Sequence, residues 1–252
     1  MRPLWGIVLL ATIVSSADGS GVEERFSAAG QAYDEGRYEE AVAAYEELLG
    51  DGLRAPELYY NLGNAYYRSG NMGRAMLNYR SARYLAPRDR AVRHNIALVR
   101  NQTDAVYPSV STPVRWLRTV SLSEWVVVAA LAWWLTLFYA SLLLRPGRRC
   151  GWRFSVLSCA AVLLVALAGI FQWVGFRFRP EGVILAGDQE ALFAPLDHST
   201  AHFSLPEGSI TRIDTKDTKD KGWYRVVLDG KIGWIRRDAV HPVEPWRSIP
   251  SG

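Results

Sequence analysis

The chain has 252 residues, which allows one or two domains, and its 29 lysines and arginines nearly balance its 25 aspartates and glutamates. A net charge of +4, without a basic cluster interleaved with stacking aromatic residues, argues against a nucleic-acid-binding protein. Two cysteines are too few for a fold held together by disulfides. The four histidines lack partners at metal-ligand spacing, so we expect neither a metal site nor a cofactor.

The first residues have the order of a secretory signal. Arg2 precedes an apolar run over residues 4–14, and small residues follow that run. We therefore expect a signal peptide over residues 1–17, cleaved after Ala17. The rest of the chain would then be exported.

Residues 18–103 repeat themselves at one fixed offset. The pairs that share this offset are Phe26 and Tyr60, Tyr33 and Tyr67, Gly36 and Gly70, Ala41 and Ala75, and Tyr45 and Tyr79. The offset matches the tetratricopeptide period of about 34 residues. It predicts an α-helical tetratricopeptide repeat (TPR) array with repeats at 22–55 and 56–89. A helix over 90–102 continues in register without a partner helix and is expected to cap the array.

In TPR folds the first helix of each repeat lines a concave groove. Carried onto this chain, the groove residues are Phe26, Tyr33, Tyr60, Asn61, Asn64, Tyr67 and Arg68. Asn64 and Arg68 lie one helical turn apart, so together they could hold the carboxylate or backbone of a bound peptide. The alternative is that both side chains are merely solvated. Acidic residues crowd the first repeat and arginines crowd the rest, a polarity that could orient a partner or simply reflect solvated faces.

Two later runs, Trp125–Leu144 and Phe154–Val174, carry no charge. Because a helix needs about 20 apolar residues to cross a bilayer, we expect transmembrane helices over 121–144 and 154–175, joined by an arginine-rich cytoplasmic connector at 145–153. The alternative is a pair of buried helices in a soluble protein. Two spans after an exported array predict a membrane protein with both soluble domains on the extracytoplasmic side.

Short strands separated by turn residues follow the second apolar run. We expect them at 182–185, 190–194, 208–213, 223–228 and 231–235, with Asp229-Gly230 as a hairpin turn. Residues 178–245 therefore predict a small all-β barrel that resembles a bacterial SH3 domain. Trp223 and Trp234 could form its ligand-binding surface or could hold its core together. Residues 104–120 contain prolines and small polar residues and are expected to form a tether.

The order of these parts resembles the BatE proteins of bacterial aerotolerance operons. The resemblance rests on the leader, the short array ending in His94-Asn-Ile-Ala-Leu98, the tether, Ser-Glu-Trp125 before the first apolar run, and the SH3-like end. It implies a scaffold in an envelope-stress complex of the bacterial inner (cytoplasmic) membrane, with both soluble domains periplasmic and with von Willebrand factor A-type membrane proteins and a MoxR-type AAA+ ATPase as partners.

The residues favour a non-enzymatic protein-binding scaffold. No Ser/His/Asp, Cys/His, paired-carboxylate or phosphate-loop arrangement stands out that would indicate an enzyme. The alternative from the residues is a membrane anchor that binds cell-wall peptidoglycan through the SH3-like domain, with the array as a spacer.

Overall fold

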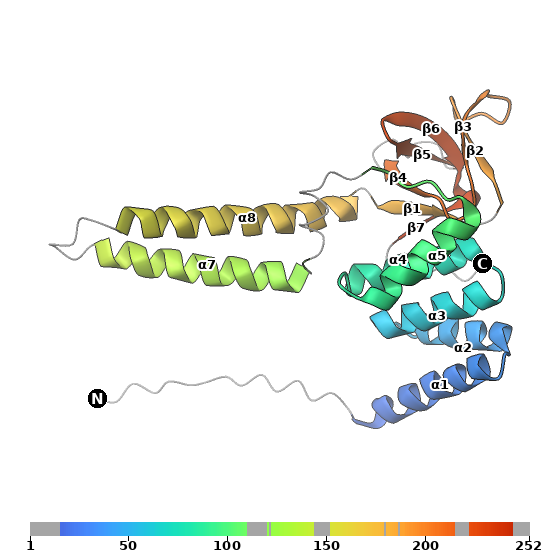
Figure 1. Ribbon diagram of the computed structural model, residues 1–252, viewed down its shortest axis with the longest axis horizontal. Helices are drawn as coiled ribbons and strands as arrows, with labels where there is room; N and C mark the ends of the chain where they lie inside the picture. The colour runs from blue at the N-terminus through green and yellow to red at the C-terminus, as the bar shows by residue number, and fades with distance from the viewer. Residues whose placement is uncertain are drawn as a thin grey trace.

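The computed structural model describes residues 16–109, 120, 122–143, 152–178, 180–185, 187–214 and 222–243. A layered helical array leads into an antiparallel helix pair and then a β-sheet, and the sheet returns to lie against the array (Figure 1). Residues 1–15 of the expected signal peptide lie outside the described residues, and the first helix already begins at Ser16.

Five helices form the array: α1 (Ser16–Asp34), α2 (Tyr38–Gly50), α3 (Pro56–Arg68), α4 (Met72–Leu85) and α5 (Arg90–Thr103). Gly36 and Gly70 follow α1 and α3 with φ angles of 80° and 84°. Side chains other than glycine rarely adopt this left-handed conformation, which ends a helix and turns the chain. The recurrence of glycine at these two positions therefore sets the two helix–turn–helix units.

Each helix of the array packs against its neighbours through small and aromatic side chains. Ala41 and Ala75 are fully buried where paired helices approach, and Tyr45 and Tyr79 are 1% exposed beside them. Gly63 lets α3 and α4 come together, since a Cβ atom at this position would lie 2.7 Å from the ring of Tyr79. Asn71 and Asp89 cap α4 and α5 by accepting hydrogen bonds from backbone N–H groups three residues later, at 3.2 and 3.1 Å.

The C-terminal part forms one antiparallel seven-stranded sheet in the order β3-β2-β6-β5-β4-β1-β7. The strands are β1 (Glu181–Ile184), β2 (Gln189–Leu192), β3 (Ala201–Leu205), β4 (Ile210–Asp214), β5 (Trp223–Leu228), β6 (Lys231–Arg236) and β7 (Val240–Pro242). A short 3-10 helix, η2 (Arg237–Ala239), precedes β7. Asp229-Gly230 turns β5 into β6, with φ angles of 48° and 83°.

The sequence analysis did not predict strand β3. Its residues Ala201–Leu205 follow a run of turn residues. The pairing of β3 with β2, in which Ala191 lies opposite Phe203, is a long-range contact that the local pattern does not encode. Between the described residues, no pairing joins the two outer strands β3 and β7.

The sheet packs directly on α4 of the array. Val183, Ile210 and Val243 belong to the same buried apolar cluster as the array's own core residues. The close approach requires Gly73, because a Cβ atom there would overlap the carbonyl oxygen of Leu185. The backbone N–H of Gly73 donates to Glu207 Oε1 at 2.6 Å.

A buried ion pair lies in the same contact. Arg80 of α4 donates to Glu181 of β1, and the two side chains are only 13% and 5% exposed. Burial removes both charges from water, and that cost is offset only while the two groups face each other. The pair therefore holds β1 in one position along α4.

The segment after α5 also joins the two parts. Val106 donates its backbone N–H to Ser209 Oγ at 3.0 Å, and its carbonyl accepts from Ile210 N at 2.9 Å. Ser109 donates from its backbone N–H and its hydroxyl to Asp229 Oδ1, both at 2.7 Å. These residues were expected to be a tether, and in the structure they lie against the sheet.

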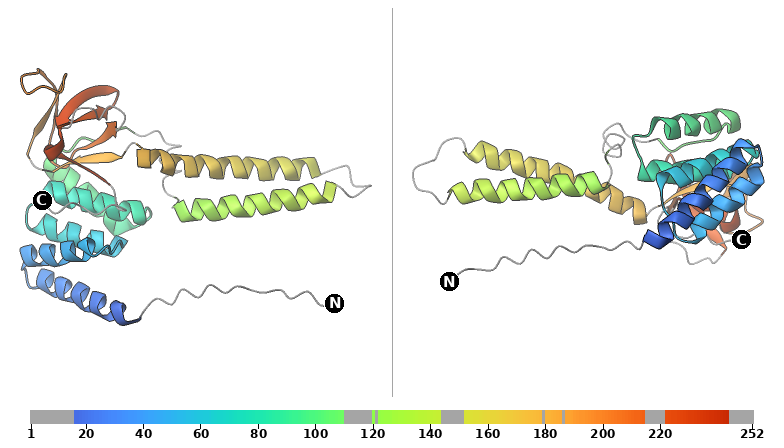
Figure 2. Two further views of the ribbon diagram at one scale, coloured as in Figure 1. Left: turned by 180° about the vertical axis from the view of Figure 1, so that it is seen from behind. Right: turned by 90° about the horizontal axis from the view of Figure 1, so that it is seen from below.

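Helices α7 (Leu122–Leu143) and α8 (Trp152–Phe178) run side by side and project from the body formed by the array and sheet (Figure 2). Trp125 is buried between them beside Gly169, where a Cβ atom would lie 2.3 Å from the indole ring if nothing moved. Large apolar side chains on the outer faces are exposed, among them Val127, Trp134 and Phe171.

The expected transmembrane hairpin is corrected by the structure. Among the helices in the described part of the chain, α7 and α8 included, none is long and apolar enough to cross a membrane. The expectation used the length of a charge-free run as its criterion. That criterion does not measure apolarity, because the run in α7 includes indoles, a tyrosine, a serine and a threonine. The fold class with a membrane hairpin over 121–144 and 154–175 is therefore wrong.

The structure also contradicts the expected localisation. Placement in a bacterial inner membrane with two spans, a cytoplasmic connector and both soluble domains on the periplasmic side required both expected spans, together with the expected signal peptide. The finding on α7 and α8 contradicts that placement.

The buried ion pair generates a first prediction. We expect Glu181→Ala to lower the free energy of unfolding by about 3–5 kcal/mol, because it removes the carboxylate that faces the buried Arg80 guanidinium. The matched control is Asp197→Ala, which removes the carboxylate from an exposed pair with Arg236 and should cost about 1 kcal/mol or less. Urea unfolding of both variants measures the difference, and equal losses would show that the pair does not anchor the sheet.

The contact at Gly73 generates a second prediction. We expect Gly73→Ala to destabilise the protein and to expose the sheet-facing side of α4 to amide hydrogen exchange, since the methyl group would meet the backbone of Leu185. Gly50→Ala is the control, because nothing lies within 4 Å of a Cβ atom at that helical position and alanine favours the helix by about 1 kcal/mol. A Gly73→Ala protein as stable as the Gly50→Ala protein would contradict the close packing.

Candidate functional site

A cavity of about 250 Å³ opens on the array, on the side formed by α1, α3 and α5. Four tyrosines, two asparagines, one arginine and one leucine line it: Tyr33, Tyr60, Tyr67, Tyr79, Asn64, Asn95, Arg68 and Leu98. All except Tyr79 come from α1, α3 or α5, which are the first helices of successive units. The cavity is therefore part of the concave groove that the repeat pattern predicts.

Helix α3 supplies half of the lining because of its periodicity. Tyr60, Asn64, Tyr67 and Arg68 recur at the three- and four-residue spacing that places side chains on one helix face. The opposite face is apolar, with Leu58, Leu62 and Ala65 fully buried. Burial of that face against the neighbouring helices turns the polar face toward the cavity.

A hydrogen-bond network fixes Asn64 at the centre of the lining. The hydroxyl of Tyr79 and the Nδ2 of Asn95 both donate to Asn64 Oδ1, each at 2.8 Å. Asn95 Nδ2 also lies 3.3 Å from the Tyr79 hydroxyl. With its oxygen engaged by two donors, the Asn64 amide keeps its NH₂ group for an acceptor in the cavity.

Arg68 supplies the positive charge of the cavity wall. Its Nη2 donates to the Tyr38 hydroxyl at 2.5 Å, and its guanidinium lies 4.9 Å from the centre of the Tyr38 ring. These contacts hold the side chain against Tyr38 at the start of α2 and leave further N–H donors on the exposed group. The combination of Asn64 NH₂ and Arg68 guanidinium suits a carboxylate or a peptide carbonyl.

The tyrosines of this region have perturbed acidities. Burial raises the pKa of Tyr33 and of Tyr79, while the charge of Arg68 opposes the change at Tyr33 and the hydrogen bond with Asn95 opposes it at Tyr79. On the other side of α3, burial and a hydrogen bond to Glu46 raise the pKa of Tyr66 to about 12. These phenols are therefore neutral hydrogen-bonding groups at physiological pH.

The structure brings together five of the seven residues expected in the groove: Tyr33, Tyr60, Asn64, Tyr67 and Arg68. The other two contact the core tyrosine of the first repeat. The ring of Phe26 packs edge-on against Tyr45 at 5.6 Å, and Asn61 forms a side-chain hydrogen bond with Tyr45.

The sequence-based expectation missed three residues that line the cavity, namely Tyr79, Asn95 and Leu98. The repeat period could have predicted Asn95 and Leu98. They lie in the expected capping helix, at the same offset from Asn61 and Asn64 that relates the two repeats. Tyr79 lies on α4, the second helix of its repeat, and only the first helices were expected to line the groove. Its hydroxyl reaches the cavity because Gly63 lets the ring lie on α3.

The two tryptophans expected at a ligand surface lie on β5 and β6. Trp223 pairs with Arg236 and Trp234 with Arg225, so all four side chains share one face of the hairpin. Val226 and Ile235 are buried on the opposite face. Both tryptophans are half-buried, and the Arg236 guanidinium lies 5.7 Å from the Trp223 ring.

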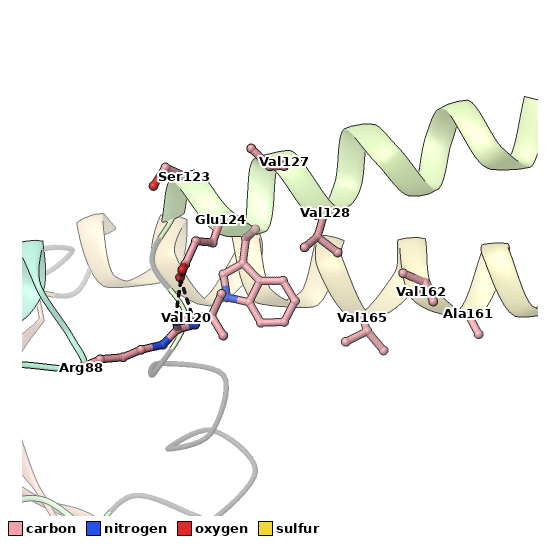
Figure 3. Close-up of a pocket in the computed structure, with 10 residues that line it drawn as sticks. Arg88, Val120, Ser123, Glu124, Val127, Val128, Ala161, Val162 and Val165 are labelled. Atoms are coloured by element: carbon pink, nitrogen blue, oxygen red, sulfur yellow. Dashed lines mark hydrogen bonds and ion pairs between the residues drawn. The ribbon is translucent and has the colours of Figure 1, made fainter.

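A second, larger cavity of about 790 Å³ lies at the base of the projecting helix pair. Figure 3 shows valines of α7 and α8 along its wall and Arg88 reaching Glu124 at one end. Arg88 donates to both carboxylate oxygens of Glu124, at 3.0 and 3.2 Å. The wall is apolar apart from this pair and Ser123.

Comparison with protein families identifies the array. Residues 31–70 match the model of the TPR repeat, and residues 56–89 match the model of the tetratricopeptide repeat. The chain contains tetratricopeptide repeats. Such repeats are typical of non-enzymatic scaffolds that bind other proteins. The search of curated proteins found no match.

The raised tyrosine pKa values generate a prediction for alkaline pH. Because the folded-state pKa of Tyr66 exceeds its unfolded value near 10, the stabilisation from the neutral phenol is complete below pH 10. It is lost as the pH rises through about 12. We expect the free energy of unfolding to fall over this interval and Tyr66→Phe to make the fall shallower. Phenolate absorbance and urea unfolding at each pH measure both effects. If the unfolding free energy falls with pH equally steeply in the wild type and in Tyr66→Phe, the Tyr66 phenol is exposed to solvent.

Proposed function

We propose that the protein is a non-enzymatic scaffold whose TPR groove binds an extended segment of a protein partner. The observation that carries the proposal is the pre-ordered amide of Asn64, which has two donors on its oxygen and stands in the wall of a cavity that Arg68 also lines. A cavity of about 250 Å³ has room for one or two side chains or a chain end.

The chemistry of the wall specifies what the segment must carry. Asn64 NH₂ and Arg68 are donors, so the bound group is an acceptor such as a carboxylate or a backbone carbonyl. The rings of Tyr33, Tyr60 and Tyr67 provide apolar surface around these donors. An acidic or carboxyl-terminal residue next to an apolar one fits both requirements.

The order of parts in the chain suggests specific partners. Its resemblance to the BatE proteins makes von Willebrand factor A-type proteins and a MoxR-type AAA+ ATPase the first candidates. The acidic first repeat and the arginine-rich later helices would orient such a partner along the groove.

The proposal is tested by removing the donors. We expect Asn64→Ala with Arg68→Ala to weaken partner binding by about 10-fold or more, because each charge-assisted or buried hydrogen bond contributes about 1.5–3 kcal/mol. Crosslinking to the full chain in cells identifies the partner, and calorimetry with the purified pair measures the affinity.

Matched controls separate the groove from general effects. Asn101→Ala and Arg90→Ala remove the same residue types from exposed positions of α5 outside the cavity lining, and they should leave the affinity unchanged. Tyr79→Phe keeps the ring but removes one of the two donors that orient Asn64, so we expect a smaller loss. If the double variant binds every partner as tightly as the controls do, the groove is not the binding site.

A further inference from the structure

The groove between α7 and α8 is walled by apolar side chains. At the base of the pair it widens into the cavity of about 790 Å³, whose polar end is formed by Arg88 and Glu124 (Figure 3). Valines and an alanine of the two helices form the wall farther along: Val127, Val128, Ala161, Val162 and Val165. A group bound along these side chains would make apolar contacts.

Helix geometry continues this apolar side beyond the cavity. Leu131 and Leu135 follow Val128 by three and seven residues, so they lie on the same face of α7, and they are 59% and 50% exposed. On α8, Leu157 precedes Ala161 by four residues, lies on the same helix face and is 66% exposed. We call these leucines and the apolar wall residues of the cavity the groove face.

The contact between α7 and α8 uses a different stripe of each helix. Trp125 and Ala132, seven residues apart, are 4% and 3% exposed, and Ala166 of α8 is fully buried. The hydroxyl of Thr136, which follows Ala132 by one helical turn, donates to the Ala132 carbonyl at 2.7 Å. Two helices bury one stripe each between them, whereas helices that are apolar on every side are ordinarily buried all round. The groove face therefore lies outside the stripe that this contact fills.

The apolar surface of the helix pair is as large as an interface requires. Four of its aromatic rings are more than half exposed: Trp133, Trp134, Phe138 and Phe171. At about 150–250 Å² per ring they expose about 500 Å² together, and the largest apolar patch of a typical monomer is about 300–600 Å². The exposed valines and leucines of both helices bring the total toward the share of each partner in a stable complex, about 800 Å².

The composition of this surface favours a second copy of the chain over a different protein. Residues 125–138 and 157–171 contain no charged side chain, so they carry no charge pattern that would distinguish one foreign protein from another. A two-fold axis brings identical faces together and gives both sides the same apolar composition. Helices α7 and α8 also project away from the array and the sheet (Figures 1 and 2), so a second pair can lie alongside them.

We propose that two copies of the chain associate through their groove faces, so that their α7–α8 pairs form a four-helix bundle about a two-fold axis. Four helices enclose a core that two cannot, because each helix then buries a second apolar stripe. Side chains of the second copy fill the cavity of about 790 Å³. The lining of the TPR groove comes from the array, so the dimer and the proposed function can fail independently.

Sedimentation of the full chain tests the dimer. A density-matched non-ionic detergent prevents unspecific aggregation, and the wild type should pass from monomer to dimer as its concentration rises. We expect Val165→Glu to raise the dissociation constant by about 10-fold or more, because it buries an unpaired carboxylate among valines. Circular dichroism checks that the variant keeps its helices, since Val165 is 47% exposed in the single chain.

The matched control is Leu167→Glu, which places the same charge on the same helix. Leu167 is 49% exposed and lies outside the cavity lining, because two residues along a helix separate nearly opposite faces. Its dissociation constant should stay near that of the wild type. Monomers at every concentration, equal weakening in both variants, or a complex with a different protein in place of the dimer overturns the proposal.

Thiol alkylation locates the interface by a second measurement. In a chain carrying Cys150→Ser and Cys159→Ser, Val128→Cys should react about 10-fold more slowly at concentrations where the dimer dominates than in the monomer, since burial suppresses the thiolate. Leu137→Cys, nine residues farther on the opposite face of α7, should react at the same rate in both. Protection of Val128→Cys that does not depend on chain concentration would show a different occupant and contradict the proposal.

Discussion

The contact between Arg80 and Glu181 is the constraint on which the arrangement of this protein depends. Two tetratricopeptide repeats and one capping helix are a short array, and such arrays usually need about three units to bury their apolar faces. The sheet provides what is missing, because Val183, Ile210 and Val243 complete the core of the array. Apolar contact alone would permit sliding, whereas the buried ion pair is satisfied at one position of β1 along α4.

Helix α4 connects this contact with the candidate groove. Tyr79 and Arg80 are consecutive, and they point to different neighbours: the Tyr79 hydroxyl reaches Asn64 in the groove, whereas Arg80 reaches Glu181 of the sheet. Any displacement of α4 would disturb both contacts. The sheet therefore stabilises the helix that positions Asn64, even though none of its described residues lines the cavity.

The projecting helix pair is attached to the same body through an ion pair and through an apolar cluster at Trp125, against which Tyr84 of α4 packs. Arg88, just after α4, donates to both oxygens of Glu124 at the start of α7. Trp125 is buried between the pair next to Gly169, while Val127, Trp134 and Phe171 are exposed. Exposed apolar surface of this extent is characteristic of interaction sites. The charge-free runs predicted the positions of these helices, but the absence of charge did not establish a membrane span.

Local patterns in the sequence determined the elements of the array. Glycines at Gly36 and Gly70 end helices because other residues rarely adopt their backbone conformation, and the repeat offset placed Tyr33, Tyr60, Asn64, Tyr67 and Arg68 on the helix faces that line one cavity. Several strands followed in the same way from turn residues such as Asp229-Gly230. These features depend on residues close together in the chain, so periodicity and turn chemistry are enough to predict them.

Only the tertiary structure decided how the distant parts meet. The pairing of β3 with β2, the entry of Tyr79 into the groove over Gly63, and the docking of the sheet on α4 through Gly73 and Arg80 all join segments that no periodic pattern links. The position of an ion pair between residues 80 and 181 depends on which surfaces exclude water together. The position of this pair is a property of the packed structure, and it cannot be predicted from the order of residues along the chain.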